Sequence, residues 1–143
     1  EAGENFTLGY KEAIKAINEL KEELVQKGEA SQIFGTQKAG EFEGILKNIY
    51  QTFGGCELLP TAQEKAANLI YYIIKDHPFN DGNKRIGAFM FILFLSKSGL
   101  LYKNNGEPKI SNNTLAALAL LIAQSDPNQK DMIVNLTTNL LSD

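Results

Sequence analysis

The middle of the chain contains the stretch His77-Pro78-Phe79-Asn80-Asp81-Gly82-Asn83-Lys84-Arg85, which lies between two strongly apolar segments. Apolar residues recur at helical spacing before and after this stretch, so the sequence predicts a helix on each side of a polar loop. Two such helices bury their apolar faces, and the loop between them is then held firmly at one end of the pair. We therefore expect a helix–loop–helix unit with polar side chains gathered at its turn.

The loop residues combine side chains that suit phosphate chemistry. His77 is the only histidine, and an imidazole with an ordinary pKa of about 6.5 can accept a proton at physiological pH. Asp81 offers a hard oxygen ligand for Mg²⁺. Gly82-Asn83 opens the next helix, where unpaired N–H groups favour phosphate oxygens, and Lys84 and Arg85 add positive charge. The loop therefore predicts a base, a metal ligand and an anion site.

Each of these residues also has a purely structural interpretation. A histidine before a proline is often a turn residue, and Asp81-Gly82-Asn83 also suits a turn with a helix N-cap. Lys84-Arg85 also suits a solvated helix start. Phe79 is expected to anchor the loop in the core. The occurrence of all these residues together in one loop favours the functional interpretation.

The stretch resembles the signature of the Fic/Doc family, HxFx(D/E)GNxRxxR. The matching positions are His77, Pro78, Phe79, Asp81, Gly82, Asn83 and Arg85. From about Glu41 to Asp143 the chain is also similar to the C-terminal Fic domain of bacterial RhuM-type virulence-associated proteins. The resemblance implies a Fic catalytic core over residues 41–143, preceded by a helix and linker over residues 1–40, in one globular domain.

The resemblance also implies a role for each loop residue. His77 would deprotonate a target hydroxyl, Asp81 would hold Mg²⁺, and Arg85 would clamp a nucleotide phosphate. The anion hole would be lined by Gly82, Asn83 and Lys84. The implied enzyme is a protein adenylyltransferase, which moves AMP or another phosphate-containing group from ATP to a protein hydroxyl. ATP, Mg²⁺ and a protein target are thus the expected ligands and partner.

Two positions depart from the pattern for AMP transfer. Lys84 stands where that pattern has Gly, and Ala88 stands where it has a second Arg that grips the terminal phosphate. Both departures resemble the phage toxin Doc, which phosphorylates a translation elongation factor, whereas Gly82 stands where Doc-like proteins tend to have Ala. Two alternatives to AMP transfer therefore stay open: a Doc-like kinase and toxin, and a non-catalytic module that binds nucleotide.

The family's inhibitory pattern, (S/T)xxxE(G/N), is not met at Glu43-Gly44, because Ala39 stands at its first position. Glu4-Asn5 begins too near the start of the sequence to judge. Ala88 also replaces the arginine with which the inhibitory glutamate would pair. We therefore expect any inhibition to come from a separate protein or from a missing segment, and a chain that begins at Glu1 rather than Met suggests a fragment.

Outside the motif, the spacing of apolar residues predicts an all-α bundle with one short hairpin. Helices are expected over residues 7–27, 61–75, 83–98, 114–124 and 126–141. The core of the last two helices is expected to contain Leu115, Leu118, Leu121 and Ile122, followed by Met132, Ile133, Leu136 and Leu140. Segment 28–40 is expected to be a loop or linker with a weak apolar contact at Ile33-Phe34.

Segment 43–60 mixes β-branched, aromatic and turn residues, although Gly44-Ile45-Leu46 could also end a helix. A Gly-Gly pair between two short extended runs predicts a hairpin over residues 49–59. By resemblance this hairpin would be the family's flap, which docks the target as an added strand. The expected docking residues are Thr52, Phe53, Gly54, Gly55 and Cys56. A plain surface hairpin is the structural alternative.

Composition excludes several classes of function. The chain has 143 residues, of which 43% are hydrophobic, and a net charge of −3, so we expect one globular core and no nucleic-acid surface. Cys56 is the only cysteine, which excludes an internal disulfide and fits a bacterial cytoplasm, while transfer into a host cell stays open. The apolar run 86–95 is expected to be a buried helix, because roughly twenty residues are needed to cross a membrane.

Overall fold

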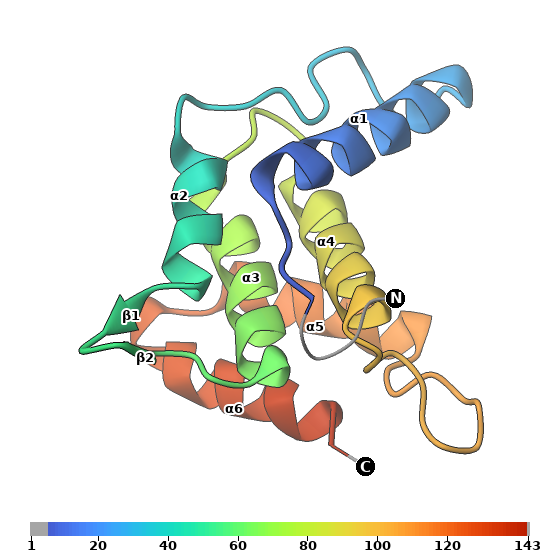
Figure 1. Cartoon of the computed structure of the whole chain (residues 1–143). Coiled ribbons are helices and arrows are strands. Elements are labelled where there is room, and N and C mark those ends of the chain that lie inside the picture. Colours follow the sequence, from blue (N-terminus) through green and yellow to red (C-terminus); the bar gives the residue numbers. More distant parts are fainter. Residues whose placement is uncertain (1–5, 143) are drawn as a thin grey trace.

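The computed structural model describes residues 6–142 and confirms the all-α class (Figure 1). Glu4-Asn5 therefore lies outside the described residues. The elements are α1 (Tyr10–Gln26), α2 (Glu41–Ile49), β1 (Thr52–Phe53), β2 (Cys56–Glu57), α3 (Ala62–Asp76), α4 (Asn83–Lys97), α5 (Asn112–Gln124), a 3₁₀ turn (Pro127–Gln129) and α6 (Lys130–Leu140).

Helices α3 and α4 form the centre of the bundle, and the motif loop joins them at one end (Figure 1). Both bury large apolar side chains completely, as expected for helices that are covered on most sides. Gly87 brings the two backbones close together, because a Cβ there would lie only 3.0 Å from the Ile74 side chain. The predicted helix–loop–helix unit is therefore present, and its two arms are tightly packed.

The start of α3 is fixed by a capping box in the run Thr61-Ala62-Gln63-Glu64. The Glu64 N–H donates to Thr61 Oγ1 at 3.0 Å, and the Thr61 N–H donates to Glu64 Oε1 at 3.1 Å. These reciprocal bonds satisfy two N–H groups that the helix itself leaves unpaired. The helix then runs without interruption to the residue before His77.

Helix α2 confirms the alternative that the sequence left open for segment 43–60, in which Gly44-Ile45-Leu46 belongs to a helix. Its buried residues are Phe42, Ile45, Leu46 and Ile49, which stand at helical spacing. The run is short, follows a glycine-rich loop and contains β-branched and aromatic residues. Because such residues also suit a strand, the helical periodicity of this run is hard to recognise in the sequence. Burial of this apolar face against α3 stabilises a helix that local propensity leaves undecided.

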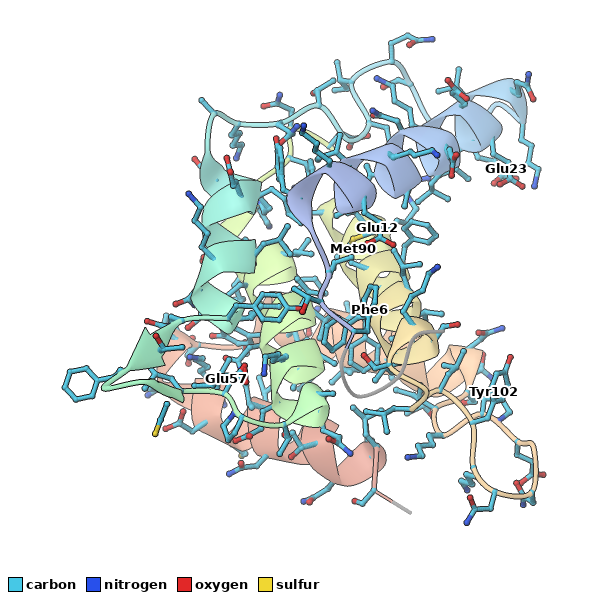
Figure 2. All side chains as sticks on the ribbon, viewed as in Figure 1. Phe6, Glu12, Glu23, Glu57, Met90 and Tyr102 are labelled. Carbon is cyan, nitrogen blue, oxygen red and sulfur yellow. The ribbon has the colours of Figure 1, made fainter. Side chains whose placement is uncertain are left out.

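The predicted hairpin exists, with Phe53 paired to Cys56 across a two-residue turn. Gly54 and Gly55 both have positive φ, 60° and 82°, as a tight hairpin turn of this length requires. The hairpin is attached to the first part of α3 through an ion pair of 3.0 Å between Glu57 and Lys65. Figure 2 labels Glu57 on this hairpin, beside the start of α3.

The core predicted for α5 and α6 is only partly correct, because some of its residues lie on the outer faces of these helices. Leu118, Ile122 and Ile133 are buried as expected. Leu121, Met132 and Leu136 are instead exposed, with 44%, 61% and 42% of their surface accessible. Helix α5 packs against α3 and α4, and α6 packs against α3, so these three residues lie on faces that the described bundle leaves partly uncovered. Within that range, no helix is both long and apolar enough to span a membrane.

Candidate active site

His77 follows the last turn of α3 in a left-handed conformation, with φ 52° and ψ 61°. Among the described residues it is the only one besides glycine with positive φ. That conformation costs roughly 1–2 kcal/mol for a residue with a Cβ, so it persists only where the surroundings enforce it. The side chain is exposed and makes no hydrogen bond or ion pair within residues 6–142. The imidazole is thus accessible from solvent.

Phe79 is the anchor of the loop, as predicted. Its ring is fully buried and lies 5.1 Å from the ring of Phe42 on α2. Its backbone is held by Asn83, whose Nδ2 donates to the Phe79 carbonyl at 2.8 Å and whose Oδ1 accepts from the Phe79 N–H at 3.0 Å. The Asn83 side chain is therefore engaged within the loop, and its backbone N–H remains for an anion.

The start of α4 presents the free N–H groups on which the predicted anion site depends. The first bond of the helix runs from the Ile86 N–H to the Gly82 carbonyl, at 2.8 Å. The N–H groups of Asn83, Lys84 and Arg85 precede that bond and therefore have no acceptor inside the helix. They lie at the positive end of the helix dipole, which favours phosphate oxygens.

Gly82 is required at its position for two reasons. Its φ is 86°, which favours glycine, and a Cβ there would lie 2.5 Å from Cδ2 of the Phe34 ring. Phe34 is itself fully buried, in the loop between α1 and α2. The sequence predicted only a weak contact for Phe34, whereas the structure places its ring directly beneath the anion site.

Asp81 is half-buried, and its backbone carbonyl accepts a hydrogen bond of 3.0 Å from the Gly35 N–H. Its carboxylate makes no hydrogen bond or ion pair in the described part of the chain. No group of three or more His, Cys, Asp or Glu side chains that could hold a metal occurs in that part. A single free carboxylate fits Mg²⁺ that arrives with nucleotide phosphates, because this ion commonly takes one or two carboxylates plus phosphates and water.

The two cations of the motif differ in how they are held. Arg85 lies with its guanidinium carbon 4.7 Å from the centre of the Phe34 ring, and its Nη1 donates to the Glu29 carbonyl at 2.8 Å. Lys84 is exposed and makes no hydrogen bond or ion pair within residues 6–142. Ala88 is half-buried and packs against the core, so no second guanidinium is available there.

Segment 33–38, which the sequence assigned to a linker, lies against the motif loop. The Asn80 N–H donates to the Thr36 carbonyl at 2.8 Å, and the Asn80 side chain donates to Thr36 Oγ1 at 2.9 Å. The Lys38 N–H donates to the Pro78 carbonyl at 2.9 Å, and Gln37 forms an antiparallel bridge with Phe79. Little in the local sequence marks this role, apart from an apolar pair at Ile33-Phe34.

The hairpin, by contrast, does not lie at the motif loop. It precedes the first turn of α3, whereas His77 follows the last turn of this 15-residue helix (Figure 1). At a rise of 1.5 Å per residue, this helix is roughly 22 Å long. The hairpin thus lies just before the helix that leads to the motif, as expected, and target docking by Thr52 to Cys56 stays a prediction.

A groove of about 750 Å³ opens between α2 and α3, next to the residue before His77. It is lined among others by Gly40, Glu41, Gly44, Tyr72, Lys75 and Asp76. Desolvation raises the pKa of Asp76 above its usual value, and the charge of Glu41 raises this pKa further. His77 and Lys130 lower it. A carboxyl group that ionises less readily than usual therefore lines this groove, directly before His77 in the chain.

The comparison with known proteins agrees with the motif. The model of the Fic/DOC family matches residues 10–95, which extend from the start of α1 to near the end of α4 and make up more than half of the chain. No curated protein and no solved structure gave a significant match. The similarity to RhuM-type proteins and a bacterial, cytoplasmic origin stay predictions. The extent of the family match, together with the motif geometry, shows that this chain belongs to the Fic/DOC family.

Proposed function

We propose that the chain transfers AMP from ATP to a hydroxyl group of a target protein. One observation supports this proposal. Within the motif loop, the side chains with a structural role are buried or hydrogen-bonded, whereas the imidazole and the carboxylate expected to do the chemistry are unpaired in the described part of the chain. Phe79 and Asn83 are engaged with each other and with the core. The His77 imidazole and the Asp81 carboxylate have no hydrogen-bond partner within residues 6–142. Free polar groups on a rigid loop are what a transferase needs before substrate arrives.

In the proposed reaction, His77 takes the proton of the acceptor hydroxyl. The oxygen then attacks the α-phosphorus of ATP, a new O–P bond forms, and the bond to the β-phosphate breaks, so pyrophosphate leaves. The proton stays on the imidazole until solvent removes it. The left-handed backbone at His77 ends α3 and leads the chain into the motif loop.

The first turn of α4 would stabilise the negative charge of the phosphates during transfer. The N–H groups of Asn83, Lys84 and Arg85 are already fixed by the helix, so no reorganisation is needed when charge develops. The Arg85 guanidinium adds a charged donor at the same end of α4. Mg²⁺, held by Asp81, would neutralise further phosphate charge when bound.

The runner-up function is phosphorylation, in the manner of a Doc-like kinase. It is favoured by the absence of a guanidinium at Ala88, one turn beyond Arg85, and by the free cation of Lys84. Without a second arginine to hold the terminal phosphate away from His77, ATP could bind in the opposite direction. The γ-phosphate would then face the base.

Radiolabel transfer distinguishes the two reactions. The chain is incubated with Mg²⁺ and a bacterial lysate, together with ATP labelled with ³²P at either the α- or the γ-phosphate. Protein label from the α-position that disappears in His77→Ala supports AMP transfer, whereas label from the γ-position alone supports the kinase. If neither nucleotide labels any protein while both bind the chain, the non-catalytic nucleotide-binding module is favoured.

A further inference from the structure

Arg85 is the only arginine in the chain. The family pattern has a second guanidinium one turn later, but Ala88 occupies that position here. All recognition of phosphate by a guanidinium therefore depends on one side chain. An exposed arginine loses considerable rotamer freedom when it binds a ligand, which weakens binding unless the side chain is already restrained.

The structure restrains Arg85 through the loop between α1 and α2. The guanidinium carbon lies 4.7 Å from the centre of the Phe34 ring, within the range of a cation–π contact. Nη1 donates to the Glu29 carbonyl at 2.8 Å. The ring supports the cation from one side and the hydrogen bond fixes one donor. Four of the five N–H donors of a guanidinium then have no acceptor in the described part of the chain.

Phe34 is a rigid support because it is fixed on all sides. It is fully buried, and its ring fills the space that a Cβ at Gly82 would need. The next residue, Gly35, donates its N–H to the Asp81 carbonyl at 3.0 Å. One aromatic ring thus contacts both the glycine of the anion site and the guanidinium that completes it.

From this geometry we propose that Phe34 is a positioning residue that holds Arg85 ready to bind a nucleotide phosphate. This inference rests on the proposed function. Phe34 acts through Arg85 and does not touch the substrate itself. An exposed cation–π contact corresponds to about a two- to fivefold change in affinity, which sets the size of the effect expected for ATP.

The restraint can be measured in the protein without nucleotide. Because the chain has a single arginine, a ¹⁵N-labelled sample gives one arginine Nε–H resonance that needs no assignment. A guanidinium above an aromatic ring is shielded, so this resonance is expected upfield of its free value. Phe34→Leu should remove the shift and Phe34→Tyr should retain it. An unchanged resonance in Phe34→Leu would overturn the proposal.

A double-mutant cycle tests whether Phe34 affects nucleotide binding through Arg85. Isothermal titration calorimetry measures the Kd of ATP with Mg²⁺ for the wild type, Phe34→Leu, Arg85→Ala and the double variant. Phe34→Leu should weaken binding about two- to fivefold alone and not at all in the Arg85→Ala background. Losses that add independently would contradict a positioning role.

A matched core variant separates positioning from loss of stability. Phe91→Leu removes the same atoms from another fully buried phenylalanine, which makes no cation–π contact among residues 6–142. It should leave the Nε–H resonance and the Kd of ATP unchanged; equal effects of both variants would overturn the proposal. If the wild type binds no ATP, the proposed function fails, while the resonance still shows whether Phe34 holds Arg85.

Discussion

Asn83 binds both backbone polar groups of Phe79, at 2.8 Å through its Nδ2 and at 3.0 Å through its Oδ1. A side chain on the first turn of α4 thereby closes the motif loop onto itself. The Phe79 ring is fully buried at the same time, so the loop is fixed from both backbone and side chain. His77 stands two residues before Phe79, and Asp81 stands two residues after it. The hydrogen bonds between Asn83 and Phe79 therefore help to position both residues.

Asn83→Ala is expected to destabilise the protein by about 2–4 kcal/mol. Two hydrogen bonds are lost and two partly buried backbone groups are left without their acceptor or donor, which costs more than the bonds themselves contributed. Urea denaturation monitored by circular dichroism measures the change. Asn113→Ala is the control, because Asn113 is exposed and makes no side-chain hydrogen bond in the described structure. Equal stability of the two variants would show that the hydrogen bonds between Asn83 and Phe79 do not stabilise the fold.

Gly82→Ala tests the close approach of Phe34. The new Cβ would lie within 2.5 Å of ring atom Cδ2, in addition to the strain of a φ of 86°. We expect a loss of about 2–4 kcal/mol, because overpacking adds to the backbone strain. Gly106→Ala has nearly the same φ, 89°, but no atom within 4 Å, so it should cost only about 1 kcal/mol. Guanidinium chloride titrations of both variants give the difference, and no difference would mean that Phe34 moves aside freely.

Replacement of His77 by glycine or by alanine should have the same effect on activity but different effects on stability. Because φ is 52°, glycine relieves a strain that alanine retains, and His77→Gly should be about 1 kcal/mol more stable than His77→Ala. Both variants should lose label transfer, because each lacks the imidazole. Thermal unfolding and the radiolabel assay are measured on the same samples. Equal stability of the two variants would show that the left-handed backbone at His77 is not strained.

Asp76 should make the protein less stable as pH rises. Its pKa is raised in the folded state by desolvation and by Glu41, so the folded protein binds its proton more tightly than the unfolded chain does. Stability therefore falls as pH rises from the usual aspartate pKa through the raised one. Asp76→Asn should be more stable than the wild type at pH 7, and the difference should vanish near pH 3.

Denaturation curves from pH 3 to 7 measure this difference. The charged groups that act on Asp76 are Glu41, His77 and Lys130, so Glu41→Gln should reduce the effect of Asp76→Asn at pH 7. A stability difference between wild type and Asp76→Asn that stays constant over this pH range would contradict the raised pKa.

Much of the fold could be predicted because its signals are local. The capping box at Thr61 and Glu64, the paired glycines of the hairpin and the apolar periodicity of α3 and α4 all depend on residues a few positions apart. A helix at α2 was only an alternative in the sequence, because a nine-residue run with aromatic and β-branched content has no clear local preference. The outer residues of α5 and α6 were misplaced because periodicity identifies an apolar face but not whether anything covers it.

Nine consecutive positions carry the motif, so the helix–loop–helix unit and its chemical residues can be identified without a structure. The surroundings of that loop, by contrast, depend on how the helices pack. The segment with Phe34 and Thr36 stands more than forty residues before the loop, yet it contacts Gly82, Arg85 and Asn80, while the hairpin lies at the far end of α3. Such contacts arise from how whole helices pack, and packing depends on the summed burial of distant side chains rather than on any short pattern.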